Sequence, residues 1–161
     1  MEIKGKSFLV AGIGKSGIAA AKVLLRDGGR VYVYDKKSDA QIPEEVKCCG
    51  KVEGSYFGSV PENGEKFDYL VISPGIPLDE DIAVFAGTNC GEIIGELELA
   101  YRLSKGKYLA ITGTNGKTTT TSLVGEILEK AGRETYVVGN IGYPVIEAAE
   151  KSSEDVAASF V

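Results

Sequence analysis

Short, continuous apolar runs recur along the chain, beginning with SFLVA at 7–11, RVYVY at 30–34 and YLVIS at 69–73. A strand that exposes one face alternates apolar with polar residues, whereas a parallel strand buried on both faces is apolar throughout. These runs therefore predict buried parallel strands. With the weaker runs included, strands are predicted at 7–11, 30–34, 69–73, 92–94, 107–112, 134–138 and 155–161.

Segments with helical spacing of apolar residues separate the predicted strands. They predict helices at 16–26, 79–86, 95–104 and 117–131, the first and last of which are followed by glycine. Strands that alternate with helices indicate an α/β fold built on a parallel sheet. The segment 36–66 has no clear period and is expected to hold at most one weak strand.

Composition narrows the classes of function. The 161 residues are 43% hydrophobic and 25% charged, as in an ordinary globular protein, and the net charge of −5 argues against a broad basic surface for nucleic acid. No apolar run approaches the roughly 20 residues of a membrane span. The three cysteines lack metal-type spacing, and their odd number fits a reducing, cytoplasmic location. The absence of histidine excludes His-based triads and His-ligated zinc within this chain.

The loop after the first predicted strand carries a phosphate-binding motif. Gly12, Gly14 and Gly17 form G-x-G-x-x-G at the start of the first predicted helix. Such glycines permit a tight turn and let a diphosphate approach the helix N-terminus, where free N–H groups favour anions. Asp35 closes the second strand and can accept hydrogen bonds from a ribose hydroxyl or a base edge. This context predicts a Rossmann-like N-terminal domain.

The motif does not identify its ligand. NAD, FAD and UDP-sugars all present a similar diphosphate, and glycines of this kind can also serve only to pack a helix against a strand. An oxidoreductase that uses NAD, or a nucleotide-sensing module, is therefore the alternative function.

A second loop, ITGTNGKTTTTSL at 111–123, resembles a P-loop with a shorter spacing. The common form is G-x-x-x-x-G-K-[ST], but here the first glycine is Gly113, three residues before Gly116. Lys117 can reach the β- and γ-phosphates, and the Thr118 hydroxyl can bind Mg²⁺. Because threonine is a poor helix former, the run at 118–121 favours ligand binding over a solvated helix start.

The short P-loop, GTNGKTTTTSLVGEIL at 113–128, resembles the ATP loop of the Mur ligases and of the folylpolyglutamate synthases, which form amide bonds through an acyl-phosphate. Folylpolyglutamate synthases lack the N-terminal glycine loop. Asn115 favours the branch of the Mur ligase family that adds D-glutamate over the branch that adds L-alanine. Further stretches that resemble this branch are GIGKSGIAAA at 12–21, SPGIP at 73–77, GELELA at 95–100 and GNIGYP at 139–144.

The resemblance implies a role for each matching residue. The first loop would hold a UDP-sugar in place of NAD, with its diphosphate near Gly14, Lys15, Ser16 and Gly17. Its uridine would lie near Asp35, Lys36, Lys37 and Gly75, and its muramoyl-alanine end near Asn140. Other members of the family use threonine and arginine where Lys36 and Lys37 stand, and two lysines after a strand also fit a solvated surface.

The second loop would bind ATP, with Lys117 and Thr118 catalytic and Thr118 also a metal ligand. The residues implied in ATP binding are Gly113, Thr114, Asn115, Gly116, Lys117, Thr118 and Thr119.

The resemblance also implies a domain plan and a reaction. Residues 1–93 would form the UDP-substrate domain, 94–106 a linking helix, and 107–161 the first part of a P-loop ATP-binding central domain. The whole enzyme would be a cytoplasmic monomer that uses ATP and Mg²⁺ to join D-glutamate to UDP-N-acetylmuramoyl-L-alanine in peptidoglycan synthesis. Because the family has three domains, this chain is expected to be an inactive fragment.

Overall fold

The computed structural model of the chain describes residues 1–62, 64–139, 144–152 and 157–160. The chain forms two compact units, Met1–Leu99 and Ala100–Val161, and each contains its own parallel sheet. None of the helices in the described ranges has the length and apolar character that crossing a bilayer requires.

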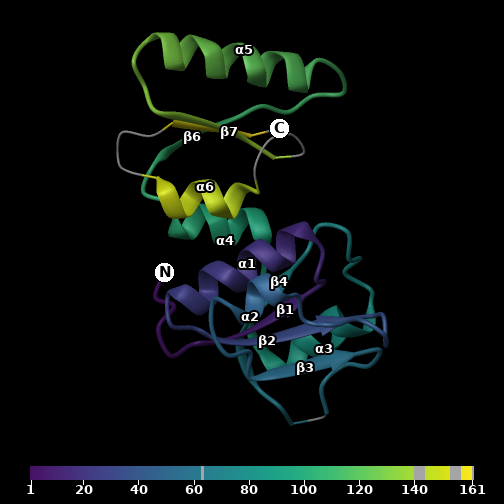
Figure 1. Cartoon of the computed structure of the whole chain (residues 1–161). Coiled ribbons are helices and arrows are strands. Elements are labelled where there is room, and N and C mark those ends of the chain that lie inside the picture. Colours follow the sequence, from purple (N-terminus) through teal and green to yellow (C-terminus); the bar gives the residue numbers. More distant parts are fainter. Residues whose placement is uncertain (63, 140–143, 153–156, 161) are drawn as a thin grey trace. The chain divides into compact units, whose positions relative to one another are not determined.

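The N-terminal unit is an open five-stranded parallel sheet with the strand order β3-β2-β1-β4-β5 (Figure 1). Helix α1 connects β1 to β2, α2 precedes β3, and α3 connects β4 to β5. The element bounds are β1 Ser7–Ala11, α1 Lys15–Arg26, β2 Arg30–Asp35, α2 Glu44–Lys47, β3 Gly54–Phe57, β4 Phe67–Ile72, α3 Asp81–Asn89 and β5 Cys90–Gly95.

The central strand β1 is buried on both faces, which explains its uninterrupted apolar sequence. Leu9 and Ala11 belong to a core cluster that includes Ile82 and Phe85 of α3. Because side chains alternate along a strand, Phe8 and Val10 point to the opposite face, where α1 lies (Figure 1). The two helices therefore cover opposite faces of the sheet.

The carboxyl ends of three neighbouring strands lie level with one another. Ala11 of β1 pairs with Ile72 of β4, and Ile72 pairs in turn with Gly95 of β5. The chain runs from β1 to β2 on one side and from β4 to β5 on the other, so the strand order reverses direction between β1 and β4. Open α/β sheets bind ligands outside the carboxyl ends of their strands at such a point.

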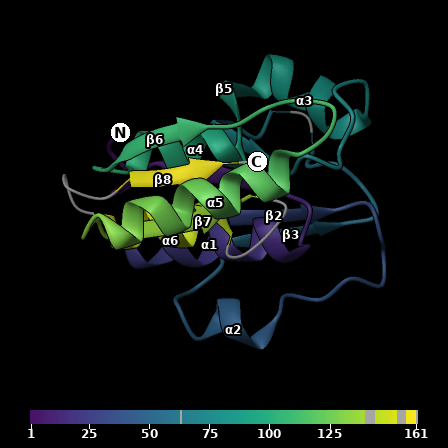
Figure 2. The ribbon, with the colours of Figure 1, turned by 90° about the horizontal axis from the view of Figure 1, so that it is seen from above.

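The second unit contains a three-stranded parallel sheet with the order β6-β8-β7, between helices α5 and α6. Figure 2 shows α5 lying along β7 and β8. Two small residues of α5, Thr121 and Gly125, are its buried positions, and a Cβ added at Gly125 would lie 2.6 Å from a methyl carbon of Val137. Glycine therefore permits close packing of α5 on this sheet. The bounds are β6 Lys107–Ala110, α5 Lys117–Lys130, β7 Thr135–Val138, α6 Val145–Lys151 and β8 Ala157–Phe160.

The predicted α/β class with parallel sheets is confirmed, and most predicted elements lie within two residues of the observed ones. The unplaced segment 36–66 holds α2 and the edge strand β3. The strand predicted at 107–112 ends at Ala110, and α6 was not predicted. The helix predicted at 95–104 is observed as α4, Glu96–Leu103, and the two units divide inside it.

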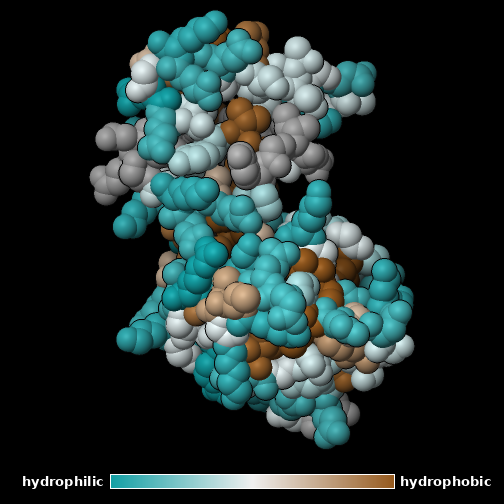
Figure 3. Space-filling view, in the orientation of Figure 1, coloured by the Kyte–Doolittle hydropathy of each residue, from teal (hydrophilic) through white to brown (hydrophobic). Residues whose placement is uncertain are grey.

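Hydrophilic residues cover most of the visible surface of each unit, and hydrophobic residues show between them on the N-terminal unit (Figure 3). This is the usual surface of a water-exposed domain, because polar surface alone cannot cover a small protein.

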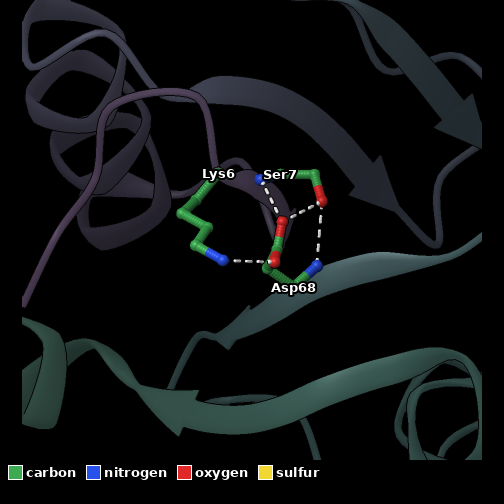
Figure 4. A network of polar contacts seen from close by, with 3 residues as sticks. All are labelled: Lys6, Ser7 and Asp68. Carbon is green, nitrogen blue, oxygen red and sulfur yellow. Dashed lines mark hydrogen bonds and ion pairs between the residues drawn. The ribbon is translucent and has the colours of Figure 1, made fainter.

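A polar network ties the beginning of β1 to the beginning of β4 (Figure 4). One carboxylate oxygen of Asp68 accepts hydrogen bonds from the Ser7 backbone N–H and hydroxyl, each at 2.8 Å. The other accepts one from the Lys6 ammonium at 3.1 Å. These donors stabilise the charged carboxylate, with the two Ser7 bonds the largest contributions, and lower the pKa of Asp68 to about 2.

Replacing Asp68 should therefore destabilise the N-terminal unit in a pH-dependent way. We expect Asp68→Asn to lower the free energy of unfolding in urea at pH 7 by about 1 kcal/mol, a figure discounted because solvent screens a partly exposed group. The Asp68 pKa falls from 3.8 when unfolded to about 2 when folded, so its contribution is present above pH 3.8 and is lost as pH falls towards 2. The difference between variant and parent should shrink over that interval. The exposed Asp39→Asn variant is the control, and an equal loss there would contradict the assignment.

Candidate nucleotide-binding site

The glycine loop turns sharply at the end of β1. Gly12 has a φ of +87°, a conformation that favours glycine, and its N–H donates to the Tyr34 carbonyl at 2.8 Å. A Cβ added at Gly17 would lie 1.8 Å from the Gly12 carbonyl oxygen, so only glycine fits there. Gly14 has an ordinary φ of −74° and nothing within 4 Å of an added Cβ. The first and third glycines of the motif are therefore required by the fold, whereas the second leaves open space beside the start of α1.

Both carboxylate oxygens of Asp35 accept hydrogen bonds from backbone N–H groups. Its Oδ2 accepts a hydrogen bond from the Ile13 N–H at 3.1 Å, and its Oδ1 accepts one from the Lys37 N–H at 3.0 Å. A carboxylate oxygen has two lone pairs, so each can accept a further bond from a ligand. Asp35 thus holds the glycine loop in place, a role that the sequence did not indicate.

A pocket of about 220 Å³ opens between the ends of β1, β2 and β4. Typical ligand pockets begin near 300 Å³, so this one suits a single ring of a nucleotide rather than a whole dinucleotide. It brings together the predicted Asp35, Lys36 and Gly75. Its lining consists of Gly12, Tyr34, Asp35, Lys36, Gly75, Ile76, Pro77, Glu80 and Ile82.

An ion pair spans this pocket. The Lys36 ammonium lies 2.9 Å from a carboxylate oxygen of Glu80, and this hydrogen bond and charge raise the pKa of Lys36. Burial, followed by the charge of Glu80, raises the pKa of the Tyr34 phenol, which therefore stays a neutral donor at pH 7. Glu80 was not among the residues predicted from the sequence. Lys37 is exposed, and it is the backbone N–H of Lys37 that donates to Asp35.

The residues expected near a diphosphate lie at the start of α1. Gly14 and Lys15 are exposed, and Ser16 is partly buried. The Ile18 N–H donates to the Gly14 carbonyl at 2.9 Å and closes the first helical turn. The Ser16 hydroxyl is hydrogen-bonded to the Glu96 carboxyl, and burial raises the pKa of Glu96. Glu96 belongs to the GELELA stretch but was not predicted as a site residue.

The second candidate loop lies in the second unit, between β6 and α5. Gly113 and Gly116 have φ values of +154° and +78°. The Lys117 ammonium folds back over the loop and donates to the Gly113 carbonyl at 2.5 Å. Thr114 and Asn115 are exposed between them. This arrangement fits a phosphate, because both the lysine and the backbone N–H groups of an αL-containing turn are available to an anion.

The threonines that follow differ in their environment. Thr118 and Thr119 are exposed in the first turn of α5, where Thr118 can offer one hydroxyl to a metal ion. Thr121 is fully buried, and its hydroxyl donates to the Lys117 carbonyl at 2.9 Å. The prediction that the threonine run at 118–121 binds a ligand is therefore wrong for Thr121, whose hydroxyl bonds to the helix backbone one turn earlier. No group of three or more acidic, cysteine or histidine side chains within the described ranges could hold a metal ion alone.

The predicted Asn140 lies outside the described residues. The cysteines Cys48, Cys49 and Cys90 are free thiols.

Two family models match separate parts of the chain. The N-terminal domain of MurD-like Mur ligases matches residues 6–95, and the Mur ligase middle domain matches residues 111–158. The first match alone covers more than half of the chain. The chain therefore belongs to the Mur ligase family and has a MurD-like N-terminal domain.

Similar curated proteins are named UDP-N-acetylmuramoylalanine–D-glutamate ligase. The protein of Thermoanaerobacter sp. (strain X514) is 47% identical over 157 residues, which cover 96% of this chain and 35% of that protein. The protein of Clostridioides difficile (strain 630) is 45% identical over 159 residues, with the same coverage of 96% and 35%. This chain thus spans about one third of the length of the curated relatives it matches.

Solved structures share the fold across different classes of protein. A UDP-N-acetylmuramate:L-alanyl-gamma-D-glutamyl-meso-diaminopimelate ligase from Neisseria meningitides has a TM-score of 0.50 at 22% identity, covering 97% of this chain and 52% of that chain. A short-chain type dehydrogenase/reductase from Mycobacterium marinum also has a TM-score of 0.50, at 14% identity, covering 99% of this chain and 94% of that chain. The fold alone therefore does not identify a family, whereas the sequence matches identify the Mur ligase family.

The contrast between Gly17 and Gly14 can be measured directly. We expect Gly17→Ala to lower the free energy of unfolding in urea by about 1–3 kcal/mol, because its methyl group would overlap the Gly12 carbonyl oxygen. Gly14→Ala is the matched control and should change stability by less than about 0.5 kcal/mol. Equal losses in the two variants would show that the loop does not have the geometry described.

Proposed function

We propose that the pocket at the ends of β1, β2 and β4 holds the uridine of a UDP-sugar whose diphosphate lies at the start of α1. The pocket carries this proposal, because it places Asp35 and Lys36 beside Gly75 at the point where the strand order reverses. Its size suits one ring, and the exposed Gly14 and Lys15 leave room for a diphosphate beside it. The names of the relatives support a UDP-N-acetylmuramoyl-L-alanine substrate.

The second loop would bind the phosphates of ATP. Lys117 would exchange its bond to the Gly113 carbonyl for bonds to phosphate oxygens, and the N–H groups at the start of α5 would face the same anion. Thr118 would contribute one ligand to Mg²⁺, which would supply positive charge for phosphoryl transfer. The remaining residues implied from the sequence, Thr114, Asn115 and Thr119, are exposed beside this loop and would contact the nucleotide.

The whole protein would then act as a peptidoglycan-synthesis ligase. The alanine carboxylate of the UDP-sugar would attack the γ-phosphorus of ATP, releasing ADP and forming an acyl-phosphate. The amine of D-glutamate would attack that carbonyl carbon, lose a proton, and expel inorganic phosphate as the amide forms. Lys117 would stabilise charge that develops on the transferred phosphoryl group. This reaction would take place in the cytoplasm, with the whole enzyme a monomer and this chain inactive by itself.

The first test compares ligands on the 161-residue chain. We expect UDP or UDP-N-acetylmuramoyl-L-alanine to shift the backbone NMR signals of residues 12–17 and 75–77, with a weaker response to NAD. ATP should instead shift the signals of residues 113–119. Tight NAD binding without any response to UDP would favour the oxidoreductase alternative.

The second test measures catalysis in the whole protein. Lys117→Ala should lower kcat by about 10²–10³-fold, the loss typical of removing one group that stabilises transition-state charge. Lys130→Ala, which removes an exposed lysine at the far end of α5, is the control and should keep near-parental activity. Phosphate release that does not require D-glutamate, or that L-lysine supports equally well, would show that the assigned reaction is wrong.

A further inference from the structure

Glu96 occupies an unusual position for a carboxylate. Gly95 of β5 pairs with Ile72 of β4, which pairs with Ala11 of β1. The residues that follow these three strands therefore leave the sheet at the same edge. These next residues are Gly12, Ser73 and Glu96. The first two belong to the loops that flank the candidate ligand site, and the Ser73 hydroxyl lies 3.4 Å from the Gly12 carbonyl. Glu96 is thus the acidic member of this row of three residues, which lies at the carboxyl ends of the strands, beside the candidate ligand site.

The carboxyl of Glu96 is buried and bonded to the glycine loop. Glu96 is 7% exposed, and its carboxyl group is hydrogen-bonded to the hydroxyl of Ser16 in the first turn of α1. Burial is the largest influence on Glu96 and raises its pKa, whereas the Ser16 bond lowers it. Glu96 also begins α4, whose N-terminus favours the charged form of a carboxyl group.

The direction of the Ser16–Glu96 hydrogen bond depends on the charge of the carboxyl. An ionised carboxylate can only accept, so the Ser16 hydroxyl must donate its one hydrogen bond to Glu96. The hydroxyl oxygen can then only accept hydrogen bonds from other groups. A protonated carboxyl can donate to that oxygen, and the Ser16 hydroxyl is then able to donate elsewhere. Only the second arrangement lets the Ser16 hydroxyl donate to an anion at the start of α1.

We propose that Glu96 is a positioning residue that takes up a proton when a uridine diphosphate ester binds, so that Ser16 can donate to a phosphate oxygen. This inference rests on the proposed binding of a UDP-sugar in the N-terminal unit. A diphosphate brought close to a buried carboxyl adds a like charge, which raises its pKa further. Binding of the diphosphate and protonation of Glu96 therefore favour each other.

The sign of the pH dependence follows from this linkage. Because the pKa of Glu96 is higher in the bound state than in the free state, affinity is greatest below the free-state pKa and falls as pH rises towards the bound-state pKa. The charged side chains on the segments at this edge of the sheet include Lys15, Asp35, Lys36, Lys37, Asp79, Glu80, Asp81 and Glu98.

The experiment uses calorimetry on the full 161-residue chain with UDP-N-acetylglucosamine. Both phosphates of this diester keep a constant charge between about pH 5 and 8, so the probe itself does not titrate there. We expect Kd to rise with pH, by up to about tenfold per unit. Titrations in two buffers of different ionisation enthalpy should show fractional proton uptake by the complex. This measurement on the parent chain needs no variant.

Two variants assign the proton to Glu96. Glu96→Gln is a neutral donor to Ser16, so its Kd should change by less than about twofold over the same pH range. Glu98→Gln removes the same charge from an exposed position on α4 and should keep the parental pH dependence. Proton uptake that persists in Glu96→Gln, or a flat profile in the parent chain, would overturn this inference and leave the UDP-sugar assignment intact. Absence of binding at every pH would overturn the proposed function, and this inference with it.

Discussion

Backbone hydrogen bonds between parallel strands hold the end of β1 level with the ends of β2 and β4. Ala11 pairs with Tyr34 on one side and with Ile72 on the other, so the chain leaves the sheet at neighbouring points after each strand. A slip of one residue would turn every buried side chain of β1 to the wrong face. The register is therefore fixed by the core, and the positions of the glycine loop, Asp35 and the SPGIP loop are consequences of it.

Strands and helices that bury many apolar side chains are evident from the sequence. Those that bury few, or that are very short, are poorly predicted. β1 is apolar throughout because both of its faces are covered, which makes it visible in the sequence. The edge strand β3, with the sequence GSYF, has no fully buried residue and therefore has no such pattern. The helix α2 spans four residues, too few for a helical period to be recognised.

The candidate site likewise contains residues that a local motif predicts and residues that only the folded chain brings together. The motif identifies Gly12 and Gly17 because a turn and a close approach are local requirements of the loop. Glu80 meets Lys36 across 44 residues of sequence, and the spacing of charged residues does not indicate that contact. Ser16 and Glu96 meet only because α1 and α4 begin beside the same edge of the sheet. The sequence could therefore indicate the loops and Asp35, but not Glu80 and Glu96, whose partners are distant in the sequence.

The two candidate loops satisfy their polar groups differently before any ligand binds. In the first, the Ile13 N–H already donates to Asp35, and the residues exposed to a ligand are Gly14 and Lys15 at the start of α1. In the second, the lysine that would bind phosphate is bound to the Gly113 carbonyl of its own loop. That bond joins a charged donor to a neutral carbonyl, whereas a bond to phosphate would join two opposite charges, which attract each other more strongly. The lysine can therefore lie folded over its own loop and still exchange its carbonyl partner for a phosphate, while Asp35 fixes the first loop through the Ile13 N–H.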